Sequence, residues 1–156
     1  MIVRPASPAD AVAMADLLNR IIAIGGTTAH QTPKSAETVR HDYIDGPETL
    51  TCVVAEAGGQ IIGWQSVGWH HGDAHIGTFV APDVQAKGTG AALFAQTRAL
   101  CRAKAVTDIF ATIRADNVPG LAYYARLGFT DIGAEPEYAL NTGQIVGRIQ
   151  RKLSLR

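Results

Sequence analysis

The chain has 156 residues, of which 47% are hydrophobic and 18% charged, and this composition excludes intrinsic disorder. Lys+Arg and Asp+Glu both number 14, so the formal net charge is zero. A balanced charge argues against a general basic surface for nucleic acid or for an anionic membrane, so any bound anion must be held locally. At this length we expect one domain, residues 1–156, burying about 68–70% of the surface that the unfolded chain exposes.

The two cysteines, Cys52 and Cys101, have no CxxC partner, which excludes a disulfide framework and a zinc ribbon. The first residues lack the apolar region of an export signal, and no stretch approaches 18 uninterrupted apolar residues. Unpaired thiols without an export signal predict a reducing, cytoplasmic setting.

The first half of the chain predicts two helices after a short strand at residues 2–3. Residues 7–10, Ser-Pro-Ala-Asp, are typical of a helix start, with Ser as N-cap and Asp at the third helical position. An apolar stripe at helical period follows over residues 14–21, and the glycine pair at 25–26 ends that helix. A second, shorter helix is expected from about 35 to 44.

The middle of the chain predicts three strands and then the longest helix. Residues 51–57 and 60–69 flank Gly58-Gly59, which is a hairpin signal, and residues 74–80 form a third strand. The helix is expected over about 87–104, where apolar residues again recur at helical period.

The last third predicts a strand over 108–114, a short helix over 118–127 that ends at a glycine, and closing strands over 130–138 and 145–153. The resulting order, β-α-α-β-β-β-α-β-α-β-β, indicates an α/β fold of the mixed α+β kind, with one sheet and helices packed on it.

The segment with the clearest chemical meaning is the turn between the third strand of the middle group and the long helix. The first N–H groups of such a helix have no intrahelical partner, and the helix dipole adds about half a positive charge there. Gly88 and Gly90 are expected to let a ligand approach the backbone, and Lys87 adds a positive charge. The pattern predicts a phosphate cradle made mostly of main chain.

Spacing separates three ligand classes that use such a turn. No G-x-x-x-x-G-K-[ST] run occurs, which excludes a P-loop. A dinucleotide fingerprint requires Gly or Ala where Leu93 stands, and an acid at the end of the next strand, whereas Asp108 lies at its start. The third class is the pyrophosphate of coenzyme A.

The run Gln85-Ala86-Lys87-Gly88-Thr89-Gly90 resembles the [Q/R]-x-x-G-x-[G/A] signature of the GNAT superfamily of N-acetyltransferases. Asn117 and Tyr124, followed by Leu127-Gly128-Phe129, resemble the second signature of that family. The segment from Thr27 to His30 resembles the corresponding segment in a bacterial branch of this family, whose members acetylate small amino compounds, including phosphinothricin-type amino acids.

The resemblance implies a GNAT fold, with one central, mostly antiparallel sheet and helices on both faces, and acetyl-CoA as the acyl donor. Turn amides would bind the pyrophosphate and the preceding strand would pair with the pantetheine arm. Asn117 would contact that arm or orient its own helix. By position, the implied cofactor-binding residues are Phe79, Val80, Gln85, Lys87, Gly88, Thr89, Gly90, Ala91 and Asn117.

The resemblance also implies that Tyr124 supplies a proton to the departing sulfur. Many relatives carry a glutamate base on the strand before the turn, but residues 74–80 hold no carboxylate. His30 and His75 are therefore the first candidates for the base, with Asp73 beside them, because a histidine pKa near 6.5 suits proton transfer at neutral pH.

The expected function is direct transfer of an acetyl group from acetyl-CoA to a small primary amine, with a homodimer expected from family habit. A His70/His71/Asp73/His75 metal site has no reliable ligand spacing, and no metal is expected. Two alternatives stay open: a non-catalytic acyl-CoA-binding module, and a dinucleotide-binding oxidoreductase, which Leu93 disfavours.

Overall fold

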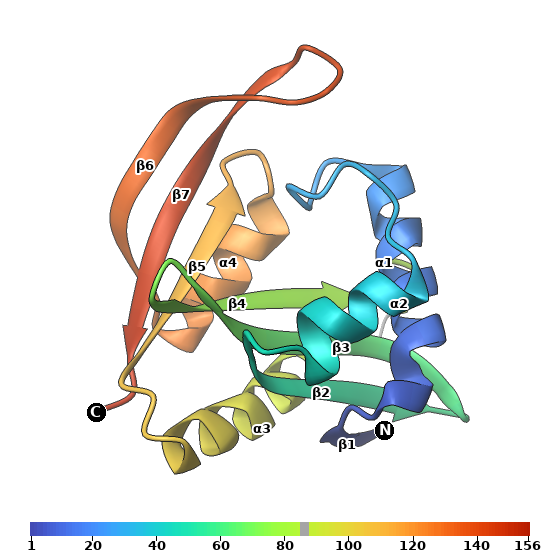
Figure 1. The fold of residues 1–156 in the computed structure, drawn as a ribbon. Coiled ribbons are helices and arrows are strands. Elements are labelled where there is room, and N and C mark those ends of the chain that lie inside the picture. The colour runs from blue at the N-terminus through green and yellow to red at the C-terminus, as the bar shows by residue number, and fades with distance from the viewer. Residues whose placement is uncertain (85–87) are drawn as a thin grey trace.

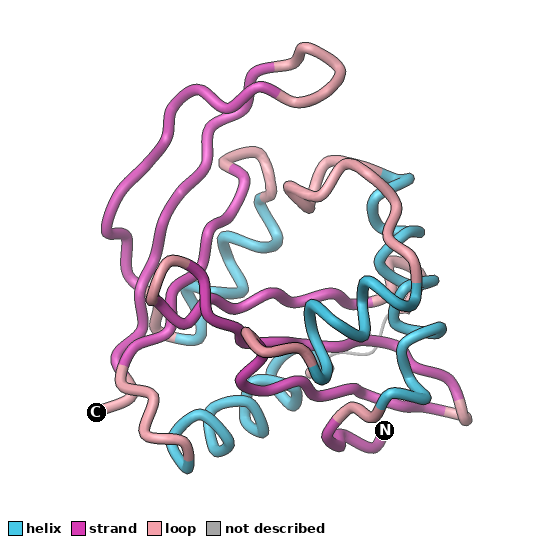
Figure 2. Tube along the Cα trace, viewed as in Figure 1, coloured by secondary structure: helices cyan, strands magenta, loops and turns pink. Residues whose placement is uncertain are grey.

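Short apolar runs separated by glycine turns form a sheet in the computed structural model, which describes residues 1–84 and 88–156 (Figures 1 and 2). Within those residues the sheet has seven strands in the order β1-β2-β3-β4-β5-β7-β6. The strands are β1 (Ile2–Pro5), β2 (Thr49–Ala57), β3 (Gln60–His70), β4 (Asp73–Val80), β5 (Asp108–Arg114), β6 (Thr130–Ala139) and β7 (Ile145–Ser154).

Helices cover both faces of the sheet, as Figure 1 shows. They are η1 (Pro8–Asp10), α1 (Ala11–Ile24), α2 (Ala36–Val39), the π-type turn η2 (Arg40–Asp45), α3 (Thr89–Ala103) and α4 (Val118–Leu127). The alternation of β2 divides the core between the two faces. Val54 packs with the α1 and α2 side chains, whereas Val53 packs with Leu93 of α3. The mixed sheet with helices on both faces confirms the fold expected from the sequence.

The start of α1 follows the expected capping pattern. The Ser7 backbone N–H donates to Asp10 Oδ2 at 2.8 Å, and Arg4 of β1 donates two hydrogen bonds to the same carboxylate at 2.8 and 2.9 Å. The hydrogen bonds from Arg4 hold the pKa of Asp10 below its usual range. None of the described helices is long and apolar enough to cross a membrane.

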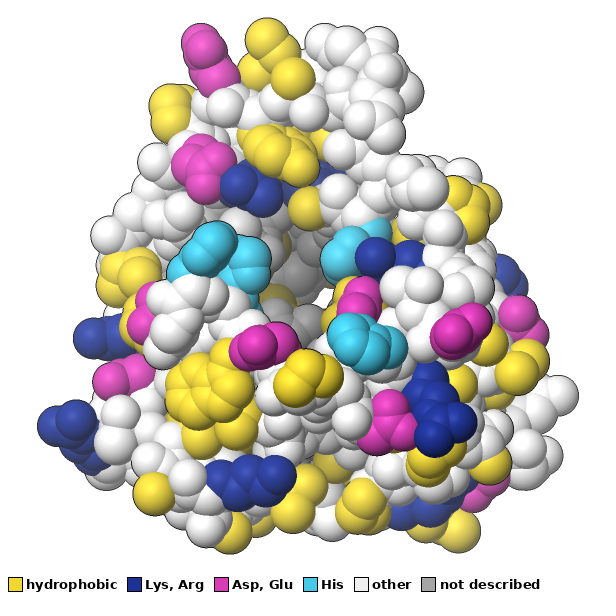
Figure 3. All heavy atoms as spheres, in the orientation of Figure 1, with side chains coloured by type: hydrophobic (Ala, Val, Ile, Leu, Met, Phe, Trp, Pro, Cys, Tyr) yellow, Lys and Arg dark blue, Asp and Glu magenta, His cyan; other side chains and the backbone are white. Residues whose placement is uncertain are grey.

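The sheet opens between β4 and β5. Neighbouring strands pair antiparallel elsewhere, but β4 and β5 are parallel, because α3 carries the chain across the sheet between them. In the described part of the chain, their register holds the single pair His75 and Phe110. Beyond that pair the strands diverge, and the molecular face in Figure 3 is hollowed near its centre, with histidine side chains on both sides.

Candidate active site

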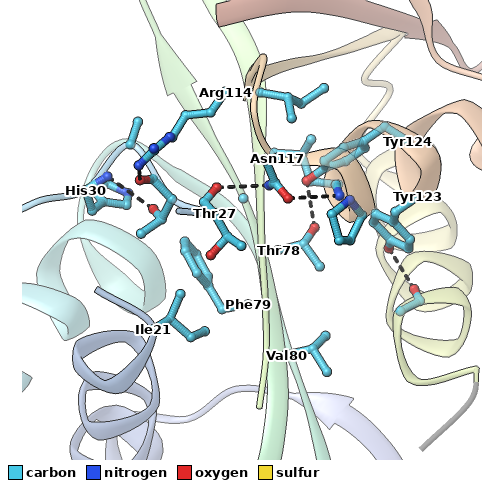
Figure 4. A pocket seen from close by; sticks show the side chains of 18 of the residues that line it. Ile21, Thr27, His30, Thr78, Phe79, Val80, Arg114, Asn117, Tyr123 and Tyr124 are labelled. Atoms are coloured by element: carbon cyan, nitrogen blue, oxygen red, sulfur yellow. Dashed lines mark hydrogen bonds between the residues drawn. The ribbon is translucent and has the colours of Figure 1, made fainter. Parts of the chain in front are cut away.

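A cavity of about 490 Å³ occupies the opening between β4 and β5, and we call it the strand cleft (Figure 4). Its walls come from the end of α1, the loop that follows, both strands and α4. The cleft collects several of the residues predicted from the sequence. Those that line it are His30, Phe79, Val80, Gly90, Asn117 and Tyr124.

The backbone of β4 presents Val80 to the cleft. The Ala81 N–H donates to Ile62 of β3 at 2.8 Å, so the alternation of the antiparallel ladder directs the Phe79 N–H to β3 as well. The Val80 N–H and C=O then point to the opposite side, where β5 has diverged. Of the two predicted strand positions, Val80 is the one whose main chain faces the cleft, and Phe79 contributes its ring.

The start of α3 lies at one end of the cleft. Gly88 is the N-cap with a φ of 91°, a conformation that favours glycine, and the first i→i−4 bond of the helix runs from the Ala92 N–H to the Gly88 carbonyl at 2.9 Å. The N–H groups of Gly90 and Ala91 precede that bond. The predicted residues Gln85 and Lys87 lie outside the described residues, and Thr89 is buried in the first turn.

Packing against α4 gives a reason for glycine at position 90 that the sequence analysis did not include. A Cβ at this position would lie 2.6 Å from Cε1 of the Tyr123 ring, which is far inside contact distance. The Tyr123 hydroxyl donates to the Gly90 carbonyl at 2.7 Å. Glycine at position 90 therefore makes room for an α4 side chain on the α3 backbone, and the close approach of a ligand at this position stays a prediction.

Tyr124 lies in the wall of the strand cleft and is 8% exposed. Its hydroxyl is 2.8 Å from Oγ1 of Thr78 on β4. Burial raises the pKa of the Tyr124 phenol, and the hydrogen bond with Thr78 lowers it. Tyr124 is thus a protonated phenol at neutral pH. Tyr123 also lines the cleft, so the two neighbouring tyrosines share this wall (Figure 4).

Asn117 joins α4 to the loop after α1. Its Oδ1 accepts from the Gly120 N–H at 3.0 Å as the N-cap of α4, and its Nδ2 donates to the Thr27 carbonyl at 2.9 Å. Next to it, the buried Arg114 donates to the Thr28 carbonyl at 3.2 Å and makes two bonds of 2.9 and 2.7 Å to Asp116. These bonds hold the loop across the cleft between the diverging strands (Figure 4).

A second cavity of about 690 Å³ adjoins the strand cleft, and we call it the histidine cavity. His30, His70, His71 and His75 line it, together with Trp69. The two cavities share part of their walls. The residues common to both are His30, Ile76, Gly77, Phe79 and Thr112. His30 therefore borders both spaces, whereas His75 borders the histidine cavity alone, stacked on Phe110 at 5.8 Å between ring centroids.

Both histidines are neutral at neutral pH. Burial lowers the pKa of His30 below 6.5, with a further lowering by Lys34, and the Tyr43 hydroxyl is 3.4 Å from its Nε2. Burial also lowers the pKa of His75, with a smaller contribution from His70. Asp73 lines the same cavity at the start of β4 and raises the pKa of His75. All three candidates for the base thus border one space.

Four features of the site were not found by sequence reasoning. Gln65 and Thr78 lie opposite each other on β3 and β4, and Gln65 Nε2 donates to Thr78 Oγ1 at 2.9 Å and to the Tyr123 hydroxyl at 3.0 Å. Arg114, which lines the strand cleft, and Arg148, which lines the histidine cavity, were likewise missed. A polar Gln65 within the apolar run of β3 was a signal that was available.

A model of the acetyltransferase (GNAT) family matches residues 16–129, which is more than half of the chain. The chain therefore belongs to the acetyltransferase (GNAT) family. A curated relative, the mycothiol acetyltransferase of Clavibacter michiganensis subsp. michiganensis (strain NCPPB 382), is 31% identical over 90 residues. The match covers 57% of this chain and 29% of that relative, so the chain spans well under half of the relative's length.

Solved structures with the same fold belong to enzymes that are named after different acceptors. A GNAT superfamily phosphinothricin acetyltransferase from Sinorhizobium meliloti, in complex with acetyl-CoA, has a TM-score of 0.84 at 19% identity, over 98% of this chain and 87% of that one. The ribosomal-protein-alanine N-acetyltransferase of Brucella melitensis has a TM-score of 0.83 at 20% identity, over 99% of each chain. The common fold therefore does not select the acceptor.

Proposed function

We propose that this chain is an N-acetyltransferase that moves an acetyl group from acetyl-CoA directly to a primary amine within a ternary complex. The observation that carries the proposal is the strand cleft. Among the described residues the parallel pair β4–β5 keeps one register position, so main-chain groups of β4 beyond it face the opening, and the protonated Tyr124 hydroxyl lies in the wall of that opening.

The cleft fits the acyl donor in three ways. The cleft extends from the start of α3 to the place where it joins the histidine cavity. The Val80 N–H and C=O offer the pairing that an extended amide-containing arm requires. The first-turn amides of Gly90 and Ala91 lie where an anionic diphosphate is favoured, which suits a chain of zero net charge. Gln85 and Lys87 remain proposed contacts at the mouth.

Acetyl-CoA supplies an electrophilic thioester carbonyl and a thiol leaving group. The Val80 N–H is the proposed donor to the thioester oxygen, on which negative charge grows during attack. Tyr124 is the proposed acid that gives its proton to the departing sulfur. A free thiol has a pKa of about 8.5, so the sulfur leaves fairly readily, and we expect the proton transfer to contribute near the lower end of about 10²–10⁴.

His30 is the favoured base because it borders both cavities, with His75 as the second candidate. A substrate ammonium must lose a proton before it attacks, and a neutral imidazole at the junction is placed to accept that proton directly or through a water. The lowered pKa of each histidine keeps the ring in its neutral, accepting form.

We propose a small molecule as the acceptor. The histidine cavity has about 690 Å³, which is within the range of roughly 300–1,000 Å³ typical of small-molecule sites. Its lining carries both signs of charge, including Glu48, Asp73 and Arg148, which suits a compound that bears an amine and an anionic group. A cytoplasmic homodimer of single-domain chains is part of the proposal, and light scattering measures the oligomeric state.

The test is release of coenzyme A thiol from acetyl-CoA with a panel of amino acids, polyamines and aminoglycosides. We expect release with a subset of the small amines. Tight acetyl-CoA binding in calorimetry without release for any amine would instead indicate the binding module. Binding of NAD(H) in place of acetyl-CoA would indicate the oxidoreductase and overturn the proposal.

A further inference from the structure

A continuous hydrogen-bond chain links α3, α4, β3 and β4 behind the strand cleft. The Tyr123 hydroxyl is 2.7 Å from the Gly90 carbonyl, and Gln65 Nε2 is 3.0 Å from Tyr123 and 2.9 Å from Thr78. Thr78 Oγ1 is 2.8 Å from the Tyr124 hydroxyl. The chain thus ends at the proposed acid.

The Gly90 carbonyl sets the direction of this chain. A carbonyl oxygen only accepts, so Tyr123 must donate its single proton to Gly90. The Tyr123 oxygen then has only acceptor capacity left for Gln65, and the Gln65 atom that faces it must be the NH₂ group. The chemistry of the neighbouring groups thus settles the amide orientation of Gln65. The second N–H of that group donates to Thr78.

The direction leaves one proton unused at the cleft. Thr78 and Tyr124 carry two hydroxyl protons between them, and one of the two forms the bond that joins them. Gln65 donates a hydrogen bond to this pair and accepts none from it. With Thr78 as donor, the Tyr124 oxygen accepts, and the Tyr124 proton is free to point into the strand cleft, which both residues line.

Burial of the polar Gln65 side chain costs free energy of folding, so stability alone does not explain a glutamine at this position. Its side chain is fully buried, and its Oε1 has no hydrogen-bond partner among the described residues. A buried carbonyl without a partner costs free energy that an apolar residue would avoid. On the same face of β3, Val67 belongs to an apolar core cluster. The two N–H groups of Gln65 make hydrogen bonds that an apolar residue could not supply.

We propose that Gln65 and Thr78 are positioning residues, which donate in series to Tyr124 so that its proton faces the departing sulfur and its oxygen is stabilised once that proton has left. This inference rests on the proposed function. In the step itself, the Tyr124 O–H bond breaks, an S–H bond forms on the coenzyme A thiolate, and Tyr124 becomes a phenolate that accepts from Thr78. The phenolate regains a proton from solvent after the thiol leaves.

The first test measures, without any turnover, whether the Thr78 hydroxyl donates to the ionised oxygen of Tyr124. A fluorinated tyrosine is placed at position 124, where its more acidic phenol can be titrated by ultraviolet absorbance in the folded protein. Because Thr78 donates to the phenolate, Thr78→Val is expected to raise the phenol pKa by about one unit, and Thr78→Ser to leave it near the original value. An unchanged or lowered pKa in Thr78→Val overturns the inference, because it means that Thr78 does not stabilise the Tyr124 phenolate.

The second test uses coenzyme A release at saturating amine. Thr78→Val and Gln65→Met are each expected to lower kcat about tenfold or more while the KM for acetyl-CoA stays the same, with Thr78→Ser retaining most activity. Thr97→Val is the matched control, since the buried Thr97 hydroxyl on α3 has no partner among the described residues, and we expect wild-type rates.

A double-mutant cycle separates positioning from a general loss of structure. In a Tyr124→Phe background, Thr78→Val is expected to have no further effect on kcat, because the oxygen on which Thr78 acts is gone. Full additivity of the two losses overturns the inference. If wild-type protein releases no coenzyme A with any amine, the proposed function fails, and the titration above still decides whether Thr78 donates to the Tyr124 phenolate.

Discussion

The strand cleft and the histidine cavity meet at His30, yet they are built from different parts of the molecule. The cleft follows from the topology: a parallel pair joined through α3 separates after His75, and buried hydrogen bonds from α4 line the gap. The histidine cavity collects side chains from η2, the β3–β4 turn, β5 and the β6–β7 hairpin. The topology therefore explains the cavity that we propose for the acyl donor, whereas the cavity that we propose for the acceptor depends on individual side chains from several elements.

The side chains that line the two cavities also differ in their partners and in their exposure. In the cleft, Tyr124, Thr78 and Asn117 are each committed to a protein partner. In the histidine cavity, Arg148 pairs with Glu135 at 2.8 Å and lies over the Tyr138 ring at 4.0 Å, while Trp69 is 42% exposed. We expect substitutions in the cleft to act equally on all acceptors, and substitutions in the histidine cavity to act selectively.

The largest effect is expected for Tyr124→Phe, which keeps the ring and removes the acid. The kcat should fall toward the lower end of about 10²–10⁴, because the sulfur then leaves unprotonated. The factor should be the same for two chemically different amines, since the proton goes to the sulfur and not to the acceptor. Coenzyme A release with both amines measures it. A factor that differs strongly between the amines would contradict the division of labour between the cavities.

Next come the two histidines. His30→Ala is expected to lower the rate at pH 7 by less than about 10²-fold, with a smaller loss for His75→Ala. A base must be neutral to accept a proton, and burial lowers the pKa of both rings, so the acid limb of the wild-type profile should lie below pH 6.5. Without the base, the rate should rise with pH as the substrate ammonium itself loses its proton. A pH–rate profile unchanged in both variants eliminates both as the base.

A smaller effect is expected where the cleft is tied to the loop. Asn117→Ala removes the N-cap of α4 and the bond to Thr27, and should cost about 1 kcal/mol of stability with a raised KM for acetyl-CoA. Asn117→Asp keeps the capping oxygen and loses the donor, so it should recover the thermal midpoint and not the KM. If Asn117→Asp recovers the KM together with the thermal midpoint, the bond to the loop has no part in binding.

Local signals account for the parts of the fold that the sequence predicted well. The hairpin at Gly58-Gly59, where both φ angles are positive, and the end of α4 at Gly128, with a φ of 100°, depend on one or two residues each. The Asn117 and Tyr124 positions came from the resemblance to the second GNAT signature, which ends at Leu127-Gly128-Phe129, and both line the strand cleft. Short-range patterns were sufficient because each of these features is decided within one turn.

Contacts between distant segments were beyond the same reasoning. Alternation shows that Gln65 and Thr78 are on strands, but their meeting depends on the register of β3 against β4. The contact of Gly90 with Tyr123 depends on how closely α3 and α4 approach, which no spacing within either helix reveals. The role of His30 at the junction follows from the path of a loop that Arg114 and Asn117 hold in place.

The smallest effect on the whole molecule is expected at Trp69, which borders the histidine cavity and not the strand cleft. Because its ring is partly exposed, Trp69→Ala should change the thermal midpoint little. It should raise the KM for the preferred amine and leave the KM for acetyl-CoA unchanged, and Trp69→Phe should recover part of the acceptor binding. If both KM values rise together, the two cavities are coupled through their shared wall, and the acceptor side cannot be altered independently of the donor side.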